Sequence, residues 1–177
     1  RLDYLYENKT GSTVLGNFGH LYFKNNGKIV LDESIESNAV SIYSGNYYEL
    51  PKKTRRTVIL EPYYYSYTKN KEDEILETSI VSPIISDNQF LGVIGADIKL
   101  SQFQQIIDNI KPFENSIAFL VSNEGMYVAN PSPEFIGKTI NDLFTEEDEA
   151  HAVSEHVKNG EFLGYSVVGL DGSMYYV

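Results

Sequence analysis

The chain of 177 residues contains no cysteine and no tryptophan. Without cysteine it can form no disulfide bond and has no thiol nucleophile or thiolate metal ligand. Basic residues are scarce too, since 14 lysines and arginines stand against 25 aspartates and glutamates, for a net charge of −11. Nucleic acids bind to basic surfaces, so this balance argues against a nucleic acid partner. No run approaches the ~18 consecutive apolar residues of a membrane-spanning helix.

Apolar residues and tyrosine are what the chain has in quantity. Its hydrophobic content of 42% is enough for a core, and its length fits one domain of ordinary size or two small ones. Fourteen tyrosines beside no tryptophan are an unusual balance. A tyrosine ring is apolar with a hydroxyl at its tip, which suits it to gripping small ligands or partners.

The most informative segment is a predicted hairpin followed by a predicted helix. Two stretches rich in isoleucine and valine, 78–85 and 90–98, flank Ser86-Asp87-Asn88, a pattern typical of a β-hairpin. Apolar residues at helical spacing then predict a helix over 100–110. Asp97 stands out because it ends an otherwise apolar strand, and burying a carboxylate costs free energy unless a cation or hydrogen bonds meet it. It is the first residue that needs an explanation.

Turn residues and apolar patterning predict the remaining elements. Strands at 18–23, 28–31 and 56–60 join those at 78–85 and 90–98 in an antiparallel sheet of about five strands, and residues 32–48 form a loop with short helical pieces. Residues 112–115 are the expected boundary of this part. Beyond it the patterns predict strands at 117–122 and 126–129, helices at 140–144 and 146–158, and a hairpin of 162–168 with 174–177.

Four motifs follow one another along the chain. They are Tyr47-Tyr48-Glu49-Leu50-Pro51, Val58-Ile59-Leu60-Glu61-Pro62-Tyr63, Ser82-Pro83-Ile84 and Gly92-Val93-Ile94-Gly95-Ala96-Asp97-Ile98. In this order they resemble motifs of the double Cache family, the tandem PAS-like extracellular sensors of bacterial and archaeal chemoreceptors, sensor histidine kinases and diguanylate cyclases. The resemblance covers residues 18–110, with a weaker match over 117–138.

This resemblance implies an α+β fold of two PAS-like modules. Each module would have an antiparallel sheet of about five strands flanked by helices, and a long N-terminal helix would precede them. Residues 1–113 are the expected membrane-distal module, and residues 114–177 are a small or truncated membrane-proximal one. Residues 1–7 would be the last turns of the N-terminal helix, along which a homodimer is expected.

The resemblance also implies a ligand site in the distal module. In amino-acid-binding members an arginine holds the ligand carboxylate, aromatic residues line the pocket, and an aspartate takes the ligand ammonium. The positions that match the aromatic residues and the aspartate are Tyr47, Tyr48, Tyr63 and Asp97, but the arginine position is Gly45. A bidentate guanidinium is hard to replace. The expected ligand is therefore an amine without a carboxylate, held by charge pairing and cation–π contact.

Two alternatives stay open at this site. In the first, Arg55 or Arg56 reaches the site from another direction and replaces the missing arginine. Adjacent residues of a strand point to opposite faces, so at most one of the two would face the pocket. Both arginines also fit the role of surface charges. Alternatively, Asp97 simply ends its strand and caps the following helix through nearby backbone N–H groups.

Other chemistries find less support in the sequence. The histidines at 20, 151 and 156 lack the spacing of metal ligands. Gly92 and Gly95 lie inside a strand rather than in a phosphate-binding loop, and no serine has the context of a nucleophile. We expect no metal, no cofactor and no catalytic residue in this chain.

These observations predict the periplasmic or extracellular sensor domain of a membrane-anchored receptor. It would bind a small molecule, an amine or amino-acid derivative, and would not be an enzyme itself, whatever output domain the receptor carries. A hydrolase with a tyrosine-lined acidic cleft is the rival interpretation, and a ligand-free structural or interaction module is the third. A pair of acids converging in a cleft would favour the hydrolase, and a pocket filled by the protein's own side chains would favour the interaction module.

Overall fold

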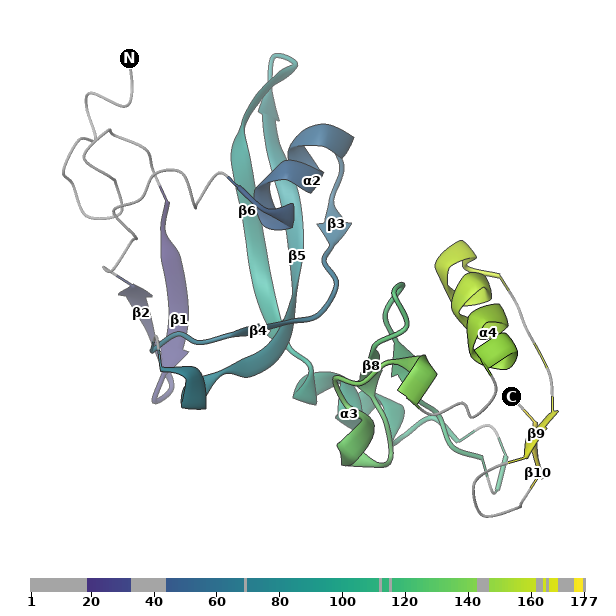
Figure 1. The fold of residues 1–177 in the computed structure, drawn as a ribbon. Helices are drawn as coiled ribbons and strands as arrows, with labels where there is room; N and C mark the ends of the chain where they lie inside the picture. Colours follow the sequence, from purple (N-terminus) through teal and green to yellow (C-terminus); the bar gives the residue numbers. More distant parts are fainter. Residues whose placement is uncertain are drawn as a thin grey trace. The chain divides into compact units, whose positions relative to one another are not determined.

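The structure, a computed structural model, describes residues 19–32, 44–68, 70–111, 113–114, 116–142, 147–161, 164, 166–168 and 174–176 (Figure 1). The expected N-terminal helix at residues 1–7, and with it the predicted dimer contact, lies outside these residues. The chain divides into two compact units. Unit 1 comprises Arg1–Val58 and Val81–Gly95, and unit 2 comprises Ile59–Ile80 and Ala96–Val177. The predicted division between residues 113 and 114 stays a prediction.

The fold is α+β with antiparallel strands, as predicted. Along the chain the elements are β1 (Leu21–Asn25), β2 (Lys28–Asp32), α2 (Asn46–Thr54), β3 (Val58–Ile59), β4 (Tyr63–Tyr65), η1 (Lys71–Asp73), β5 (Ile75–Ser86), β6 (Gln89–Lys99), α3 (Ser101–Ile107), β7 (Leu120–Val121), β8 (Tyr127–Ala129), η2 (Pro133–Phe135), η3 (Ile140–Asp142), α4 (Glu147–Asn159), β9 (Ser166–Val168) and β10 (Met174–Tyr176). No helix of the described residues has the length and apolar character needed to cross a membrane.

The central sheet is organised around β5, its longest strand at 12 residues. β6 pairs with β5, and β3 and β4 both pair with β5 as well. Pro62 explains why the chain forms two short strands here, β3 and β4, instead of one, since proline has no N–H to donate to a strand ladder. β4 continues the pairing after this break, with Tyr63 opposite Glu77.

Two tight turns join antiparallel strands, and the second of them confirms the hairpin predicted from 78–85 and 90–98. Asn26 and Gly27 join β1 to β2 with φ of 48° and 80°, and Asp87 and Asn88 join β5 to β6 with φ of 49° and 62°. Positive φ at both central residues is the pattern of the turns that match the natural twist of a hairpin. β1 and β2 form a two-stranded sheet of their own, whereas the sheet around β5 has four described strands, one fewer than expected.

Helix α2 differs from the sequence prediction, which placed loop and short helical pieces up to residue 48. The helix runs through Pro51, a residue that usually argues against a helix interior. Gly45 precedes it with φ 83° and ψ 170°, a conformation that is essentially open to glycine alone. At its other end Arg55 adopts φ 56°, and its guanidinium donates to the backbone oxygen and to Oδ1 of Asn88, both at 2.9 Å. Arg55 thus ties the helix to the β5–β6 turn within unit 1.

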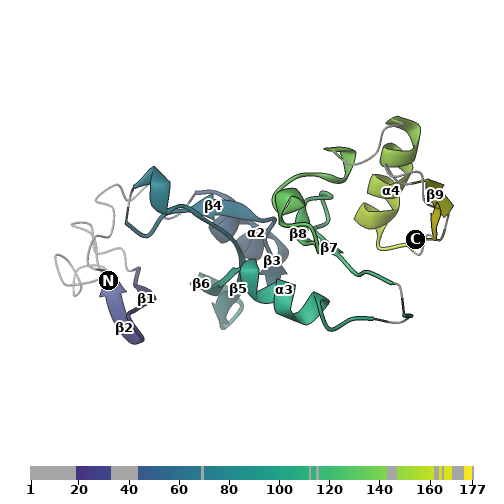
Figure 2. The ribbon, with the colours of Figure 1, turned by 90° about the horizontal axis from the view of Figure 1, so that it is seen from below.

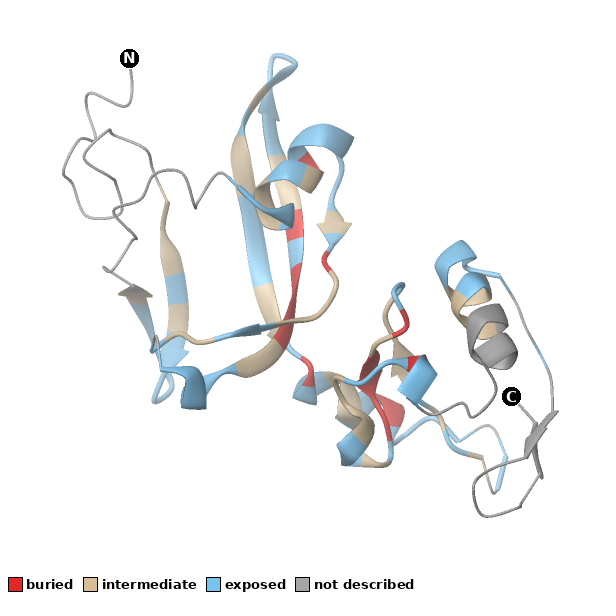
Figure 3. Ribbon diagram, in the orientation of Figure 1, coloured by how far each residue is buried: buried red, intermediate tan, exposed pale blue. Residues whose placement is uncertain are grey.

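Helix α3 begins directly where β6 ends (Figures 1 and 2). Leu100, which is 2% exposed, sits at this junction, and its N–H donates to the carbonyl oxygen of Leu76 at 3.1 Å. Buried residues lie along β5 and around β8 (Figure 3). In unit 2, Asn130 donates its backbone N–H to Oε1 of Gln104 at 3.0 Å, which links the end of β8 to α3.

The C-terminal part of unit 2 follows the predicted order of elements. Gly125, with φ 85°, makes the turn between β7 and β8. Tyr127 on β8 is 2% exposed and contacts the rings of Phe119 and Phe135, with centroids 5.6 and 6.4 Å away. Helix α4 and the strands β9 and β10 correspond to the predicted helix at 146–158 and the predicted final hairpin.

We expect Leu100→Ala to lower the free energy of unfolding by about 2–4 kcal/mol, because it leaves a cavity where strand and helix join. Chemical denaturation measures the change. Ile106→Ala in the same helix is the control, since Ile106 is 59% exposed and should cost less than about 1 kcal/mol. Equal losses from the two variants would contradict the buried position of Leu100.

Gly45→Ala should destabilise the protein by about 1–3 kcal/mol, because alanine does not tolerate the backbone conformation at this position. The space around Gly45 is open, so the loss would come from the backbone and not from a clash. Gly92→Ala is the matched control, as Gly92 has open space too and no positive φ. Thermal unfolding of both variants measures the difference, and an unchanged midpoint for Gly45→Ala would refute the conformational requirement.

Candidate functional site

Asp97 lies on β6 beside β5 and accepts hydrogen bonds from side-chain hydroxyls of unit 2. Ser79 on β5, which is fully buried, donates to Oδ1 of Asp97 at 2.7 Å. The Tyr63 hydroxyl lies 2.5 Å from Oγ of Ser79 and 3.4 Å from the same carboxylate oxygen. Because each hydroxyl has one hydrogen, the hydrogen bonds run from Tyr63 to Ser79 and from Ser79 to Asp97. The structure therefore brings together two of the predicted site residues, Tyr63 and Asp97.

The second carboxylate of the cluster is Glu77. It is 1% exposed, and both of its oxygens accept from the Tyr67 hydroxyl, at 3.0 and 3.3 Å. The same hydroxyl lies 3.3 Å from Oδ2 of Asp97. Glu77 and Ser79 are two residues apart on one strand, so their side chains share a face of the sheet. We call Tyr63, Tyr67, Glu77, Ser79 and Asp97 the acidic cluster.

Sequence reasoning missed Glu77 and Tyr67. Glu77 directly precedes the stretch read as a strand at 78–85, whereas β5 begins at Ile75. Because β5 begins at Ile75, Glu77 is an acid inside a buried strand. As for Asp97, its burial needs a cation or hydrogen bonds that compensate the charge. Tyr67 lies between the predicted strands at 56–60 and 78–85, outside every predicted element, and nothing in its local pattern shows where its hydroxyl points.

The electrostatics of the cluster follow from burial. Burial raises the pKa of the Glu77 carboxyl, and the negative charge of Asp97 raises it further, while the hydrogen bonds of Tyr67 and Tyr63 and the field of Lys99 lower it. Burial, together with Asp97 and Glu77, raises the pKa of the Tyr67 hydroxyl far above its ordinary value. Tyr67 therefore keeps its proton and acts as a hydrogen-bond donor to the two carboxylates.

The acidic cluster has no ion pair within the part of the chain that the structure describes. The ion pairs there join Glu49 to Lys52 at 3.6 Å and Glu161 to His156 at 3.8 Å. Buried carboxylates are normally met by a cation or by several donors. A small cation fits the chemistry of this cluster better than an anion does.

Asp97 does not cap helix α3. The residue before that helix is Leu100, and no side chain makes a cap hydrogen bond there. The alternative that Asp97 serves only as a helix cap is thus wrong, because its carboxylate is turned to the hydroxyls of Ser79, Tyr63 and Tyr67.

Tyr47 and Tyr48, the other two predicted site residues, lie half-buried on α2 in unit 1. The ring of Tyr48 meets Phe90 edge to face with centroids 5.4 Å apart, and Nζ of Lys52 lies 5.1 Å from the Tyr48 centroid. Tyr48 already makes one cation–π contact of the kind proposed for a ligand. A ligand-binding role for Tyr47 and Tyr48 stays a prediction.

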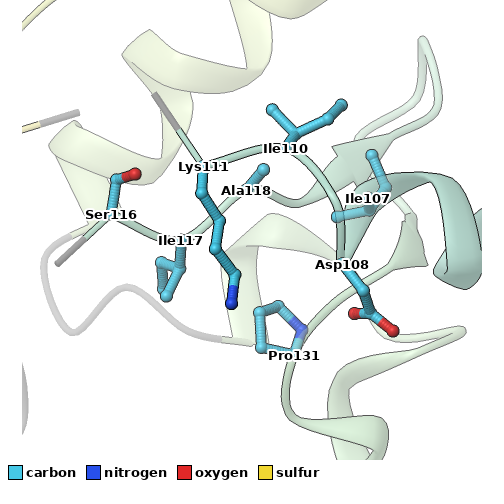
Figure 4. A pocket seen from close by; sticks show the side chains of 8 residues that line it. All are labelled: Ile107, Asp108, Ile110, Lys111, Ser116, Ile117, Ala118 and Pro131. Carbon is cyan, nitrogen blue, oxygen red and sulfur yellow. The ribbon is translucent and has the colours of Figure 1, made fainter. Parts of the chain in front are cut away.

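A cavity of about 300 Å³ lies elsewhere in unit 2, at the end of α3 (Figure 4). Its lining is mostly apolar and comes from three segments: Ile107, Asp108, Ile110 and Lys111 from α3 and the residues after it, Ser116, Ile117 and Ala118 before β7, and Pro131 after β8. None of the four predicted site residues lines this cavity.

The model of the Cache domain family matches residues 1–177, the whole chain. The methyl-accepting chemotaxis protein PscA of Pseudomonas syringae pv. tomato is 31% identical over 98 residues, which are 55% of this chain and 15% of PscA. The chain thus spans a small part of the length of this receptor.

Solved structures agree with the family match. The extracellular domain of the candidate histidine kinase mmHK1S-Z3 is 28% identical with a TM-score of 0.76, over 98% of this chain and 60% of that one. The ligand-binding domain of the Pseudomonas aeruginosa chemoreceptor PctB, in complex with L-Gln, has a TM-score of 0.56 at 19% identity, over 88% of this chain and 57% of that one. At this identity the PctB structure shows the fold alone.

Glu77→Gln should change how stability depends on pH. The folded protein holds a proton on Glu77 more tightly than the unfolded chain does, so between the ordinary pKa of 4.5 and the raised value the free energy of unfolding falls as pH rises. Glu77→Gln removes this contribution. Its free energy of unfolding minus that of the wild type should therefore increase with pH, as measured by urea denaturation from about pH 4.5 upward.

The exposed Glu72→Gln is the control, and its difference from the wild type should show no such increase. A flat or falling difference for Glu77→Gln would mean that burial does not favour the protonated form of Glu77.

Proposed function

The chain belongs to the Cache domain family, and from this premise we propose that it is the ligand-sensing part of a membrane receptor, facing the periplasm or the cell exterior. The family match over residues 1–177 and the likeness to a chemotaxis receptor and a kinase extracellular domain support this proposal. The receptor would carry its output in a part of the protein other than this chain. The sensor domain itself would have no catalytic role.

The ligand that we propose is a small amine without a carboxylate, with its ammonium group paired to Asp97. The observation that carries the proposal is the acidic cluster, in which two carboxylates and three hydroxyls gather without an ion pair among the described residues. An ammonium group donates up to three hydrogen bonds. Asp97 is the half-buried acid of the pair and Glu77 the fully buried one, so Asp97 is the carboxylate that a ligand reaches.

The backbone at Gly45 supports the absence of a carboxylate from the ligand. The resemblance to amino-acid-binding members would place a carboxylate-binding arginine there, yet the φ of 83° and ψ of 170° disfavour any side chain. Of the two arginines considered as replacements, Arg55 donates to Asn88 at the β5–β6 turn and Arg56 is exposed. L-Gln, the ligand in the PctB structure, has a carboxylate that this chain is poorly equipped to hold.

The rival interpretation as a hydrolase receives one supporting feature, the pair of acids. A hydrolase that works through a pair of acids needs both carboxyl groups to reach the substrate. Glu77, at 1% exposure and with both oxygens on Tyr67, is not placed to do so. The acid pair therefore supports ion binding better than catalysis.

We propose that the signal arises from differential binding. An ammonium at Asp97 would favour one arrangement of the end of β6, and Leu100, three residues later, joins that strand to α3. In this proposal residues 1–113 form the distal module, residues 114–177 the proximal one, and two copies associate through the N-terminal helix.

Asp97→Asn should strongly weaken the binding of amines while preserving the shape of the site. Truncating a shielded charge pair costs roughly 2–5 kcal/mol, so affinity should fall by about 30-fold or more. The measurement is a thermal shift with n-butylamine, 1,4-diaminobutane, L-glutamine and butanoate, followed by calorimetry. Amines should stabilise the wild type and butanoate should not.

Asp87→Asn, at the exposed β5–β6 turn, is the matched control and should bind as the wild type does. Stabilisation by butanoate, or intact amine binding in Asp97→Asn, would overturn the assignment of Asp97. Loss of binding in Asp87→Asn as well would point to a general loss of charge instead of a site.

A further inference from the structure

Phe113 presents an exposed aromatic ring on a hydrogen-bonded turn of unit 2. The residue is 78% exposed. Its backbone N–H donates to Oγ of Ser116 at 3.0 Å, and its carbonyl oxygen accepts from the hydroxyl and the N–H of Ser116 at 2.8 and 3.2 Å. Because these hydrogen bonds already hold the backbone of Phe113, covering the ring costs little further backbone entropy.

The cavity at the end of α3 lies beside this turn, since Ser116 also lines it (Figure 4). Phe113 itself does not line it. The volume of about 300 Å³ holds roughly ten non-hydrogen atoms at about 30 Å³ each, which is enough for the side chain of a phenylalanine. Ile110 and Ile117 in the wall are 46% and 65% exposed. The cavity therefore presents apolar surface to solvent next to an exposed ring.

A projection beside a hollow can be complementary to a second copy of the same surface. In a dimer with two-fold symmetry both copies present the same face, so a contact between two different residues occurs twice. Here the ring of Phe113 is the projection, and the cavity with Ile110 and Ile117 in its wall is the hollow. The surface thus supplies both halves of the contact, which favours a second copy over an unrelated partner.

The charges around the cavity agree with this arrangement. Lys111 lines the cavity, Glu114 follows Phe113, and both are exposed. In the ranges that the structure describes, neither belongs to an ion pair. A Phe113 ring that enters the cavity of a second copy brings Glu114 toward Lys111 of the partner subunit. Opposite charges at the edge of an interface guide its orientation.

We propose that two copies of the chain associate through this surface, with Phe113 of each copy inserted into the cavity of the other. The contact is in addition to the association through the N-terminal helix, and it does not depend on the ligand proposed at Asp97. An aromatic anchor in an apolar pocket is the usual centre of a protein interface. One ring in each direction buries little area, so the dimer is weak and reversible.

Photo-crosslinking tests the contact itself. An unlabelled chain with p-benzoylphenylalanine in place of Phe113 is mixed with the ¹⁵N-labelled wild type and irradiated. Mass spectrometry should find crosslinks from position 113 of the unlabelled copy to labelled peptides that contain Ile110 or Ile117. Crosslinks confined to one copy would mean that the ring contacts its own molecule, and they would overturn the proposal.

Phe113→Ala should raise the dissociation constant of the dimer by about thirtyfold or more, because an aromatic anchor carries much of the binding free energy. Sedimentation equilibrium measures the constant. Ile29→Ala is the matched control and should leave it unchanged, since Ile29 is 77% exposed on β2 in unit 1. An unchanged constant for Phe113→Ala, or a wild type that stays monomeric up to millimolar concentration, would contradict the proposed dimer.

A mixture of two variants tests whether the insertion is reciprocal. Phe113→Ala keeps the cavity and lacks the ring, whereas Ile117→Glu keeps the ring and places a charge in the cavity wall. Each variant alone loses both contacts, but a pair of the two retains one of them. Sedimentation velocity with one variant fluorescently labelled should therefore show tighter association in the mixture than in either variant alone. A mixture that associates no more tightly than the single variants would rule out reciprocal insertion.

Discussion

The pairing of β5 with its neighbours is the constraint on which the described fold depends. β5 hydrogen-bonds to β6 along one edge and to β3 and β4 along the other. Every second side chain of β5 points to the same face of the sheet. Glu77, Ser79 and Val81 are all buried on this strand. A shift of one residue in the register would turn the whole set to the opposite face of the sheet. The same pairing brings Tyr63 opposite Glu77 and so places a tyrosine beside the acids.

The consequence is a polar site in the middle of an apolar sheet. Buried acids destabilise a fold unless hydrogen bonds or charges compensate them. Here the compensation is a set of hydroxyls from two segments, Tyr63 and Tyr67 from the one and Ser79 on β5 from the other. Neutral hydroxyls stabilise carboxylates less than a cation does. Under the proposal of an amine ligand, stability and recognition are therefore opposed at this cluster.

The turn into helix α2 shows how backbone conformation restricts the residue at one position. Gly45 leads the chain into α2 with a φ of 83° and a ψ of 170°, and this conformation disfavours any side chain. Under the proposal of an amine ligand, the arginine that the family resemblance would place at this position is therefore absent for a reason that lies in the backbone.

Local sequence determined the hairpin of β5 and β6 and the helix that follows it, and it singled out Asp97 as a residue that needs an explanation. Each inference depends on neighbours in the chain: stretches rich in isoleucine and valine, turn residues that adopt positive φ, and one acid at the end of an apolar strand. The tertiary structure alone decided that Tyr67 joins Glu77 to Asp97, that Pro51 lies inside a helix, and that Arg55 binds the turn at Asn88. These contacts join residues 10 to 33 positions apart. Their formation depends on strand register and side-chain direction, which no local pattern encodes.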